Sequence, residues 1–228
     1  MPSIERWQEV NTSTSPVVMW GAGDQGRVNF HILQGLRVPV VAFVDDTPGK
    51  TSPIEGIPLL AGQAGLEAFL AQWQGALPRF AVAIGNPYAV ARRERHALMQ
   101  GLGMAPASFA DPSARLCASA TLGPGLQVMP MAIVNNEVRI GSQVILNTRS
   151  LVEHDCVLHD GVEMGPGAVL CGRVTVMPDT WIGAHATVNP RLTIGRNSIV
   201  GAGAVVVRDV PDNVVVTGVP ARILKRRN

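Results

Sequence analysis

"SLVEHD CVLHDG VEMGPG AVLCGR", residues 150–173, repeats one pattern every six residues. The third place of each block is aliphatic, namely Val152, Leu158, Met164 and Leu170. The second half of the blocks is rich in residues that favour turns. Short strands broken at this period are typical of a parallel β-helix, in which the aliphatic side chains stack along one axis.

The same period extends in both directions, from residue 114 to residue 209. The third place is aliphatic in all sixteen blocks: Leu116, Leu122, Val128, Val134, Ile140, Leu146, Val152, Leu158, Met164, Leu170, Val176, Ile182, Val188, Ile194, Val200 and Val206. Three blocks make one triangular coil, so residues eighteen apart lie above one another at the inter-strand spacing of about 4.8 Å. The period leaves the handedness open, and the usual crossover rule favours a right-handed winding.

The chain before the repeat follows a different order of elements. Apolar strands are expected at 15–20, 38–46 and 79–86, each followed by a helical pattern, at 27–36, 65–74 and 88–100. This βαβαβα order predicts a small parallel sheet covered by helices, half of a Rossmann fold. The segment "GMAPASFADPS" marks the join, so we expect two domains, residues 1–108 and 109–228.

The turn after the first expected strand is rich in glycine and reads "GAGDQG", residues 21–26. Such a turn brings backbone N–H groups and a helix N-terminus close to a phosphate. Asp45 lies nineteen residues past Gly26, near the ribose-binding position of the dinucleotide fingerprint. A half Rossmann fold suits a single nucleotide better than NAD, and a tight turn without a ligand is the alternative.

Composition excludes several classes of function. The formal net charge of +2 provides no basic field for nucleic acid, and the only dense basic run is "KRRN" at the end. No apolar stretch is long enough to span a membrane, and "MPSIERWQEV" lacks the features of a signal peptide. Three cysteines without CxxC spacing favour neither disulfides nor a cysteine-built zinc site. We expect a cytoplasmic protein without a metal.

Several longer motifs carry a family resemblance. They are "WGAGDQGRV", "VAFVDD", "IEGIPLL", "VAIGN", "VILNTRSLVEHDCVL", "PGAVLCGRVTV", "VGAGAVVVRDV" and "VTGVPARIL". From about residue 17 onward the chain resembles the bacterial nucleotide-sugar N-acetyltransferases of the bacillosamine and perosamine type, with their sialic-acid O-acetyltransferase relatives. The resemblance implies a left-handed β-helix, a homotrimer, and acetyl-CoA bound along the solenoid in a cleft between subunits.

The resemblance also implies the residues of two binding sites. The nucleotide of an amino sugar would be lined by Gly21, Ala22, Gly23, Asp24, Gln25, Asp45, Asp46, Gly85 and Asn86. Contacts to acetyl-CoA would come from Gly172, Glu163, Ala184, Ala202 and Arg222, and Lys225 and Arg226 are further candidates for its phosphates. The chain departs from the family at Glu163, where relatives often carry histidine, and at Gln25, where a glycine-histidine pair is common.

Acyl transfer from a thioester needs a base for the attacking amine and a donor for the oxyanion. His154 matches the family's base, Asp155 the acid that orients it, and Asn147 a further active-site residue. Gly172 follows His154 by eighteen residues, so the coil geometry predicts that it lies directly above. Without a side chain, Gly172 can let the thioester approach and offer its N–H to the oxyanion.

The sequence thus predicts acetyl-CoA-dependent N-acetylation of a nucleotide-linked amino sugar in glycan precursor synthesis. It leaves open the nucleotide (UDP, GDP or dTDP), the sugar, the acyl chain, and O-acetylation of a sugar hydroxyl as the alternative. A second alternative is a zinc enzyme that resembles γ-type carbonic anhydrases, because His154 and His159 have that family's spacing. Its third ligand would fall on Ala118, and two ligands are too few. A third alternative is a non-catalytic nucleotide-binding scaffold.

Overall fold

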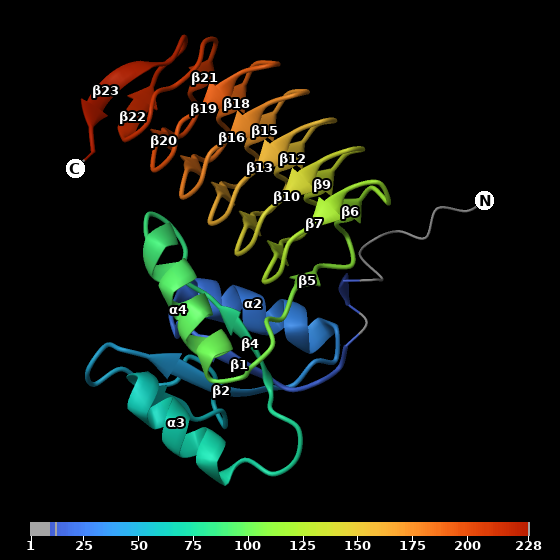
Figure 1. Cartoon of the computed structure of the whole chain (residues 1–228), viewed down its shortest axis with the longest axis vertical. Helices are drawn as coiled ribbons and strands as arrows, with labels where there is room; N and C mark the ends of the chain where they lie inside the picture. The colour runs from blue at the N-terminus through green and yellow to red at the C-terminus, as the bar shows by residue number, and fades with distance from the viewer. Residues whose placement is uncertain (1–9, 12, 228) are drawn as a thin grey trace. The chain divides into compact units, whose positions relative to one another are not determined.

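The structure is a computed structural model that describes residues 10, 11 and 13–227 (Figure 1). The segment "MPSIERWQEV", in which we expect no signal peptide, lies outside the described residues except for its last residue. That residue, Val10, packs against the solenoid core. The chain divides into two compact units, Asn11–Ser108 and a solenoid unit containing Phe109–Asn228. None of the helices in the described part of the chain has the length and apolarity needed to traverse a bilayer.

The first unit is a four-stranded parallel sheet with three helices. Its elements are β1 (Val17–Trp20), α2 (Asp24–Gly35), β2 (Val40–Asp45), β3 (Leu59–Ala61), α3 (Gly62–Gln72), β4 (Arg79–Val82) and α4 (Ala89–Gly101). The strand order is β3-β2-β1-β4. All four residues of β1 are buried, as expected for a parallel strand covered on both faces.

Every strand and helix expected in this unit has a counterpart, and the structure adds β3. This strand has only three residues, none of them buried, and pairs with β2 at the edge of the sheet. So short a segment cannot display an alternation of apolar and polar residues, which is why the sequence pattern did not reveal it. The core between sheet and helices is built by Val18, Trp20, Ala42, Val44, Leu66, Phe80, Val82, Met99 and Met104.

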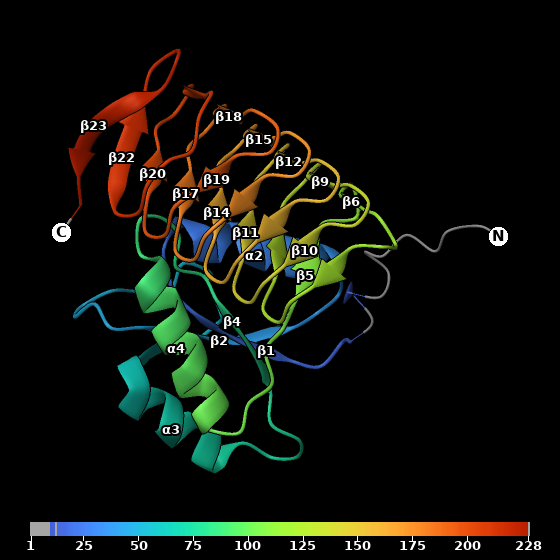
Figure 2. The same ribbon diagram turned by 45° about the horizontal axis from the view of Figure 1, so that its top comes forward.

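The solenoid unit winds through three faces, each a parallel sheet (Figures 1 and 2). Face 1 contains β5 (Phe109–Ala110), β8 (Gln127–Val128), β11 (Ile145–Leu146), β14 (Glu163–Met164), β17 (Trp181–Ile182), β20 (Ile199–Val200) and β22 (Val214–Thr217), with β23 (Arg222–Arg226) added antiparallel. Face 2 contains β6 (Arg115–Leu116), β9 (Ile133–Val134), β12 (Leu151–Val152), β15 (Val169–Leu170), β18 (Thr187–Val188) and β21 (Val205–Val206). Face 3 contains β7 (Thr121–Leu122), β10 (Arg139–Ile140), β13 (Val157–Leu158), β16 (Thr175–Val176) and β19 (Thr193–Ile194).

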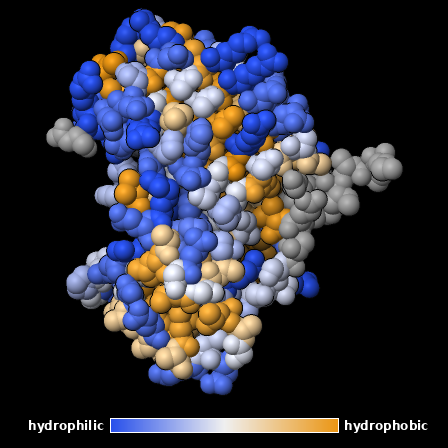
Figure 3. Space-filling model, viewed as in Figure 1, coloured by the Kyte–Doolittle hydropathy of each residue, from blue (hydrophilic) through white to orange (hydrophobic). Residues whose placement is uncertain are grey.

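The predicted register of eighteen residues is confirmed, for example by the pairing of Leu151 with Val169. The third-place side chains form the core, and all of them are buried except Leu122, which is partly buried against it. The surface drawn in Figure 3 is mainly hydrophilic over the outer coils, with single apolar residues between. The aliphatic period therefore builds the interior of the solenoid, and the corners between its faces carry the residues available for function.

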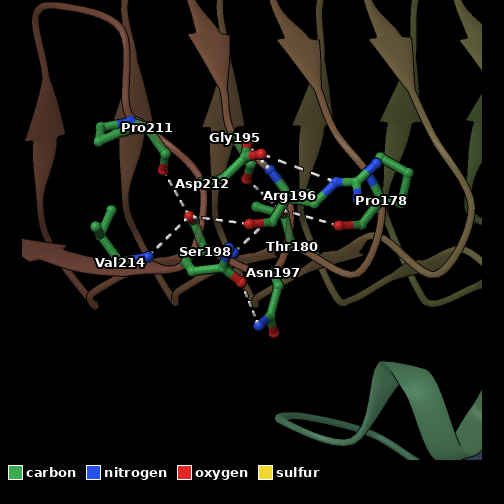
Figure 4. Close-up of polar contacts among 10 residues, drawn as sticks. Pro178, Thr180, Gly195, Arg196, Asn197, Ser198, Pro211, Asp212 and Val214 are labelled. Atoms are coloured by element: carbon green, nitrogen blue, oxygen red, sulfur yellow. Dashed lines mark hydrogen bonds and ion pairs between the residues drawn. The ribbon is translucent and has the colours of Figure 1, made fainter. Parts of the chain in front are cut away.

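The last coil is shorter than the others. Ile199 pairs with Val215, a step of sixteen residues where the earlier coils step by eighteen. Asp212 Oδ1 accepts the N–H of Arg196 at 2.8 Å, as Asp160 Oδ1 accepts the N–H of Ser142 in a full coil. The buried hydroxyl of Ser198 donates to the Pro211 carbonyl at 2.8 Å and accepts the Val214 N–H at 3.2 Å (Figure 4).

Candidate active site

The corner between faces 2 and 3, between β12 and β13 in Figure 1, carries His154. This corner is called the His154 corner below. The His154 side chain is 46% exposed, and its Nδ1 lies 2.8 Å from Asp155 Oδ2. Asp155 occupies the left-handed backbone region with φ of 59°, like the other sixth-place corner residues, and this conformation brings its carboxylate back toward the preceding imidazole.

The protonation of the pair follows from the carboxylate. The hydrogen bond with His154 lowers the pKa of Asp155 most; a small burial effect opposes it, and the charge of Arg173 lowers it further. Asp155 is therefore ionised near neutral pH and can only accept a hydrogen bond. The Nδ1 atom must carry the proton, so the neutral imidazole presents an unprotonated Nε2 to whatever binds beside it.

Gly172 lies directly above His154, as the coil spacing predicts. A Cβ atom placed on Gly172 would lie 2.5 Å from His154 Nε2 and 2.6 Å from Cε1. The next residue, Arg173, donates its N–H to the His154 carbonyl at 2.9 Å, which fixes the two coils against each other. Any side chain at position 172 would thus occupy the space next to the unprotonated nitrogen.

The amide of Gly172 takes no part in the hydrogen-bond ladder of this corner, and Gly172 itself is buried beside the His154 ring. The ladder at this corner uses the N–H of Cys171, which donates to the Val188 carbonyl, and the N–H of Arg173. The Gly172 N–H between them donates to no acceptor among the described residues. The imidazole of His154, the glycine that leaves room for it and an unpaired N–H donor therefore meet at one corner of the solenoid.

Glu153 accepts hydrogen bonds from the His154 backbone and from the coil below. Its Oε2 accepts the backbone N–H of His154 at 3.3 Å and the Nδ2 of Asn135, one coil below, at 3.0 Å. The sequence reasoning did not single out Glu153, although its place directly before the histidine and one coil above an asparagine was visible in the six-residue pattern.

Asn147 and Glu163 meet each other and not His154. Asn147 follows β11 at the corner between faces 1 and 2, called the Asn147 corner below, and Glu163 is the first residue of β14 in face 1. Asn147 Nδ2 donates to Glu163 Oε1 at 3.2 Å and to the Met164 carbonyl at 2.9 Å. Glu163 is 6% exposed. Within one chain, face 2 separates this pair from the histidine.

The expected acetyl-CoA contacts Ala184 and Ala202 stack on the Asn147 corner, where Gly203 N–H donates to the Ala184 carbonyl at 2.8 Å. Arg222, at the start of β23, lies elsewhere: it lines a cavity of about 300 Å³ together with Arg208 and the apolar residues Val206, Val216 and Ile223. Arg208 continues the column of His154 and Gly172, since it follows His154 by three steps of eighteen. Lys225 and Arg226 belong to the exposed strand β23.

The candidate nucleotide residues of the first unit gather at the carboxyl ends of its strands. The segment Gly21–Gln25, the turn after β1 together with the first residues of α2, is called the glycine-rich loop here. Gly85 and Asn86 follow β4, on the side where the strand order reverses. Gly21 has φ of +110°, and a Cβ there would lie 2.4 Å from the Ala83 carbonyl oxygen. Only glycine fits this close approach. Ligands of open parallel sheets bind at such a reversal point.

The carboxylate of Asp45 connects the glycine-rich loop to the turn after β2 through hydrogen bonds. Its Oδ2 accepts the Ala22 N–H at 2.9 Å and Lys50 Nζ at 2.7 Å, and its Oδ1 accepts the Thr47 N–H at 3.0 Å. Burial raises the pKa of Asp45, but the hydrogen bonds from Lys50, Ala22 and Thr47 outweigh it and lower the pKa to about 2. Asp45 is therefore firmly ionised, and it holds a cation beside the glycine-rich loop.

Asp46 pairs with Arg95 at 3.0 Å, and the Arg95 guanidinium lies 5.1 Å from the centre of the Trp20 ring. A cavity of about 370 Å³ opens beside the two aspartates, lined by Asp45–Lys50 and Leu59–Gly62. The sequence reasoning missed Lys50 and Arg95; a Pro-Gly turn leading to Lys50 was the available signal. Of the other loop residues, Asp24 forms an ion pair with Arg27, and Gln25 Nε2 donates to Asn29 Oδ1 at 3.1 Å.

The histidines of the zinc alternative lie apart. His154 is on its own corner, whereas His159 follows β13 and lies at the corner between faces 3 and 1. Within residues 10, 11 and 13–227 there is no group of three or more His, Cys, Asp or Glu side chains arranged to hold a metal ion.

Comparisons with known proteins agree with this architecture. Residues 173–208 match the family model "Bacterial transferase hexapeptide (six repeats)". GDP-perosamine N-acetyltransferase of Escherichia coli O157:H7 is 31% identical over 222 residues, which cover 91% of this chain and 96% of that protein. The crystal structure of PerB from Caulobacter crescentus, in complex with CoA and GDP-perosamine, is 34% identical with a TM-score of 0.85 and covers 93% of this chain and 99% of that one.

A further solved structure is the acetyltransferase domain of PglB from Neisseria gonorrhoeae FA1090, in complex with acetyl coenzyme A. It is 27% identical with a TM-score of 0.81, over 93% of this chain and 100% of that one. The similarity to the perosamine enzymes extends over both units and not the repeats alone. The chain therefore belongs to the hexapeptide-repeat acetyltransferases, in the family that includes GDP-perosamine N-acetyltransferase.

Proposed function

We propose that this protein transfers the acetyl group of acetyl-CoA to the amine of a nucleotide-linked amino sugar, with His154 as the general base. The observation that carries the proposal is the meeting of His154 Nε2 with Gly172, whose N–H is unpaired among the described residues. Of the relatives that align over nearly the whole chain, one is a GDP-perosamine N-acetyltransferase and PerB was solved with CoA and GDP-perosamine, whereas the PglB domain was solved with acetyl coenzyme A. The resemblance to this family also implies that the solenoid winds in the left-handed sense.

The reaction would proceed by direct attack. The sugar amine attacks the thioester carbonyl carbon while Nε2 of His154 takes a proton from the nitrogen. Asp155 keeps Nδ1 protonated and stabilises the imidazolium that forms. The negative charge that develops on the carbonyl oxygen faces the Gly172 N–H. Collapse of the tetrahedral intermediate breaks the carbon–sulfur bond, and the imidazolium returns its proton to the leaving thiolate.

We propose that the site is completed by a second copy of the chain. The His154 corner and the Asn147 corner are two edges of one prism and are separated by face 2. Residues of both corners can line one site only if they come from two copies, as in a cyclic homotrimer. Acetyl-CoA would then lie between the His154 corner of one protomer and Ala184 and Ala202 of the next.

Subunit mixing tests this arrangement. His154→Ala and Ala184→Trp should each be inactive alone, and their coassembled mixture should regain about a quarter of wild-type turnover, because one interface in four combines two intact corners. Separate trimers mixed without subunit exchange provide the control. A mixture that stays inactive after exchange would contradict a shared site.

The nucleotide is assigned to the first unit, at the loop Gly21–Gln25 with Asp45, Asp46, Gly85 and Asn86. Three features support this assignment. The strand order reverses between β1 and β4, a side chain at Gly21 would collide with the Ala83 carbonyl, and a cavity lies beside Asp45 and Asp46. A diphosphate would receive backbone N–H groups at the start of α2 and the ammonium of Lys50.

A substrate panel tests the whole proposal. Release of free thiol from acetyl-CoA should require a UDP-, GDP- or dTDP-linked amino sugar, with the GDP-linked sugar tested first because of the perosamine relatives. Treating the product with hydroxylamine separates the amide of N-acetylation, which persists, from the ester of O-acetylation, which is cleaved. The absence of thiol release with every amino sugar would refute the proposal.

A further inference from the structure

Arg173 faces the same carboxylate oxygen as the catalytic histidine. Its Nε lies 3.7 Å from Asp155 Oδ2, the atom that is 2.8 Å from His154 Nδ1. Arg173 is the sixth-place residue of the coil above, and its backbone is tied to the His154 carbonyl. Both residues have a left-handed backbone, with φ of 59° at Asp155 and 64° at Arg173, so their side chains leave the corner in parallel.

The Arg173–Asp155 ion pair lies where the charge of the stacked corner side chains changes from negative to positive. The sixth-place residues in the four coils around the pair are Glu137, Asp155, Arg173 and Arg191, and the column begins at Ser119 and ends at Asp209. Glu153, the remaining charged group beside the histidine, accepts the His154 backbone N–H. Asp155 therefore has acidic neighbours in Glu137 and Glu153 and a cation in Arg173, which alone of these makes an ion pair with it in the described part of the chain.

We propose that Arg173 is a positioning residue that acts through Asp155 and sets the pH range in which His154 works as a base; this rests on the proposed function. A carboxylate that is shared with a guanidinium holds an imidazolium less strongly than a carboxylate that faces the imidazole alone. Arg173 thereby extends catalysis to lower pH and helps the imidazolium to return its proton to the thiolate. It also limits the rotation of the carboxylate that holds Nδ1.

The test is the pH dependence of kcat/KM in Arg173→Gln. Without the guanidinium, the acidic limb of the profile should move to higher pH by about half a unit at low ionic strength, and by less at high salt, because both side chains are about half exposed. Arg173→Lys keeps a positive charge within reach of Asp155 and should restore most of the wild-type profile. A purely structural role would lower stability without moving the profile.

Arg191→Gln is the matched control, one coil farther along the same column and without an ion pair to Asp155 in the described part of the chain. Its acidic limb should stay within about 0.1 unit of the wild type. An unmoved profile in Arg173→Gln, or an equal shift in Arg173→Lys and Arg173→Gln, overturns the role of Arg173 while the acetyltransferase proposal stands. Full turnover in His154→Ala would instead overturn the proposed function itself.

Discussion

His154 Nδ1 is held by the side chain of its own neighbour in sequence, since Asp155 Oδ2 lies 2.8 Å away. Adjacent residues can make this contact because Asp155 takes the left-handed conformation at the solenoid corner. The orientation of the imidazole is therefore a local property of one corner. Gly172, which lies beside Nε2, in contrast comes from the next coil.

His154→Ala should lower turnover by about 10²- to 10⁴-fold, because it removes the only proposed acceptor for the amine proton. Acetyl-CoA should still bind, since the proposed contacts to the cosubstrate lie mostly on the Asn147 corner. Steady-state kinetics together with calorimetric titration of CoA separate the two effects. Loss of CoA binding, or a preserved rate, would count against the assigned role.

Asp155→Asn should lower kcat by about ten- to a hundred-fold with little change in KM. The amide keeps the size of the carboxylate but no longer stabilises the imidazolium, and its NH₂ group can favour the wrong tautomer of His154. The same kinetics measure the effect. A rate equal to that of wild type would show that Asp155 only stabilises the backbone turn at the corner and takes no part in catalysis.

Gly172→Ala should abolish most activity, because the added Cβ would lie 2.5 Å from His154 Nε2 and push the ring aside. Gly141→Ala is the matched control at the corner between faces 3 and 1, where a Cβ would lie 2.4 Å from Asp160 Oδ1. Both variants should lower the melting temperature, and only Gly172→Ala should lower turnover by about a hundredfold or more. Equal loss of activity in the two would mean that Gly172 acts through stability alone.

The parts of the fold that repeat were predictable from the sequence. Third-place residues such as Val152 and Leu170 had to face inward, and the step of eighteen placed Gly172 over His154. The parts that depend on single side-chain contacts were not predictable. The roles of Lys50 at Asp45 and Glu153 at His154 rest on side-chain conformations that the six-residue pattern does not determine, and the sixteen-residue last coil departs from the period itself.

The acid stability of the first unit should depend on Asp45. Its folded pKa of about 2 lies below the ordinary value of 3.8, so ionised Asp45 contributes stability that is complete above about pH 4 and is lost as the pH falls toward 2. Asp45→Asn should thus melt lower than wild type at pH 7, and the difference should shrink below pH 4. The exposed Glu55→Gln in the same unit is the control, with no difference at any pH.

Lys50→Gln should weaken the binding of a nucleoside diphosphate about tenfold and leave the binding of the corresponding nucleoside unchanged. The reason is that the Lys50 ammonium lies 4.0 Å from the Cβ position of Gly23, beside the loop whose N–H groups would face the phosphates in the proposed site. Calorimetric titration with GDP and guanosine measures both affinities. Equal weakening of the two ligands would indicate that the substitution only disturbs Asp45.

The shortened last coil should make Ser198 important for stability. Its fully buried hydroxyl bonds both the Pro211 carbonyl and the Val214 N–H, and alanine would leave both backbone groups unpaired away from water. We expect Ser198→Ala to cost about 2 kcal/mol, or roughly 5 °C in Tm. Ser142→Ala is the control, because that side chain is partly exposed and makes no side-chain hydrogen bond among the described residues. If the two variants melt at the same temperature, the buried hydroxyl does not stabilise the sixteen-residue coil.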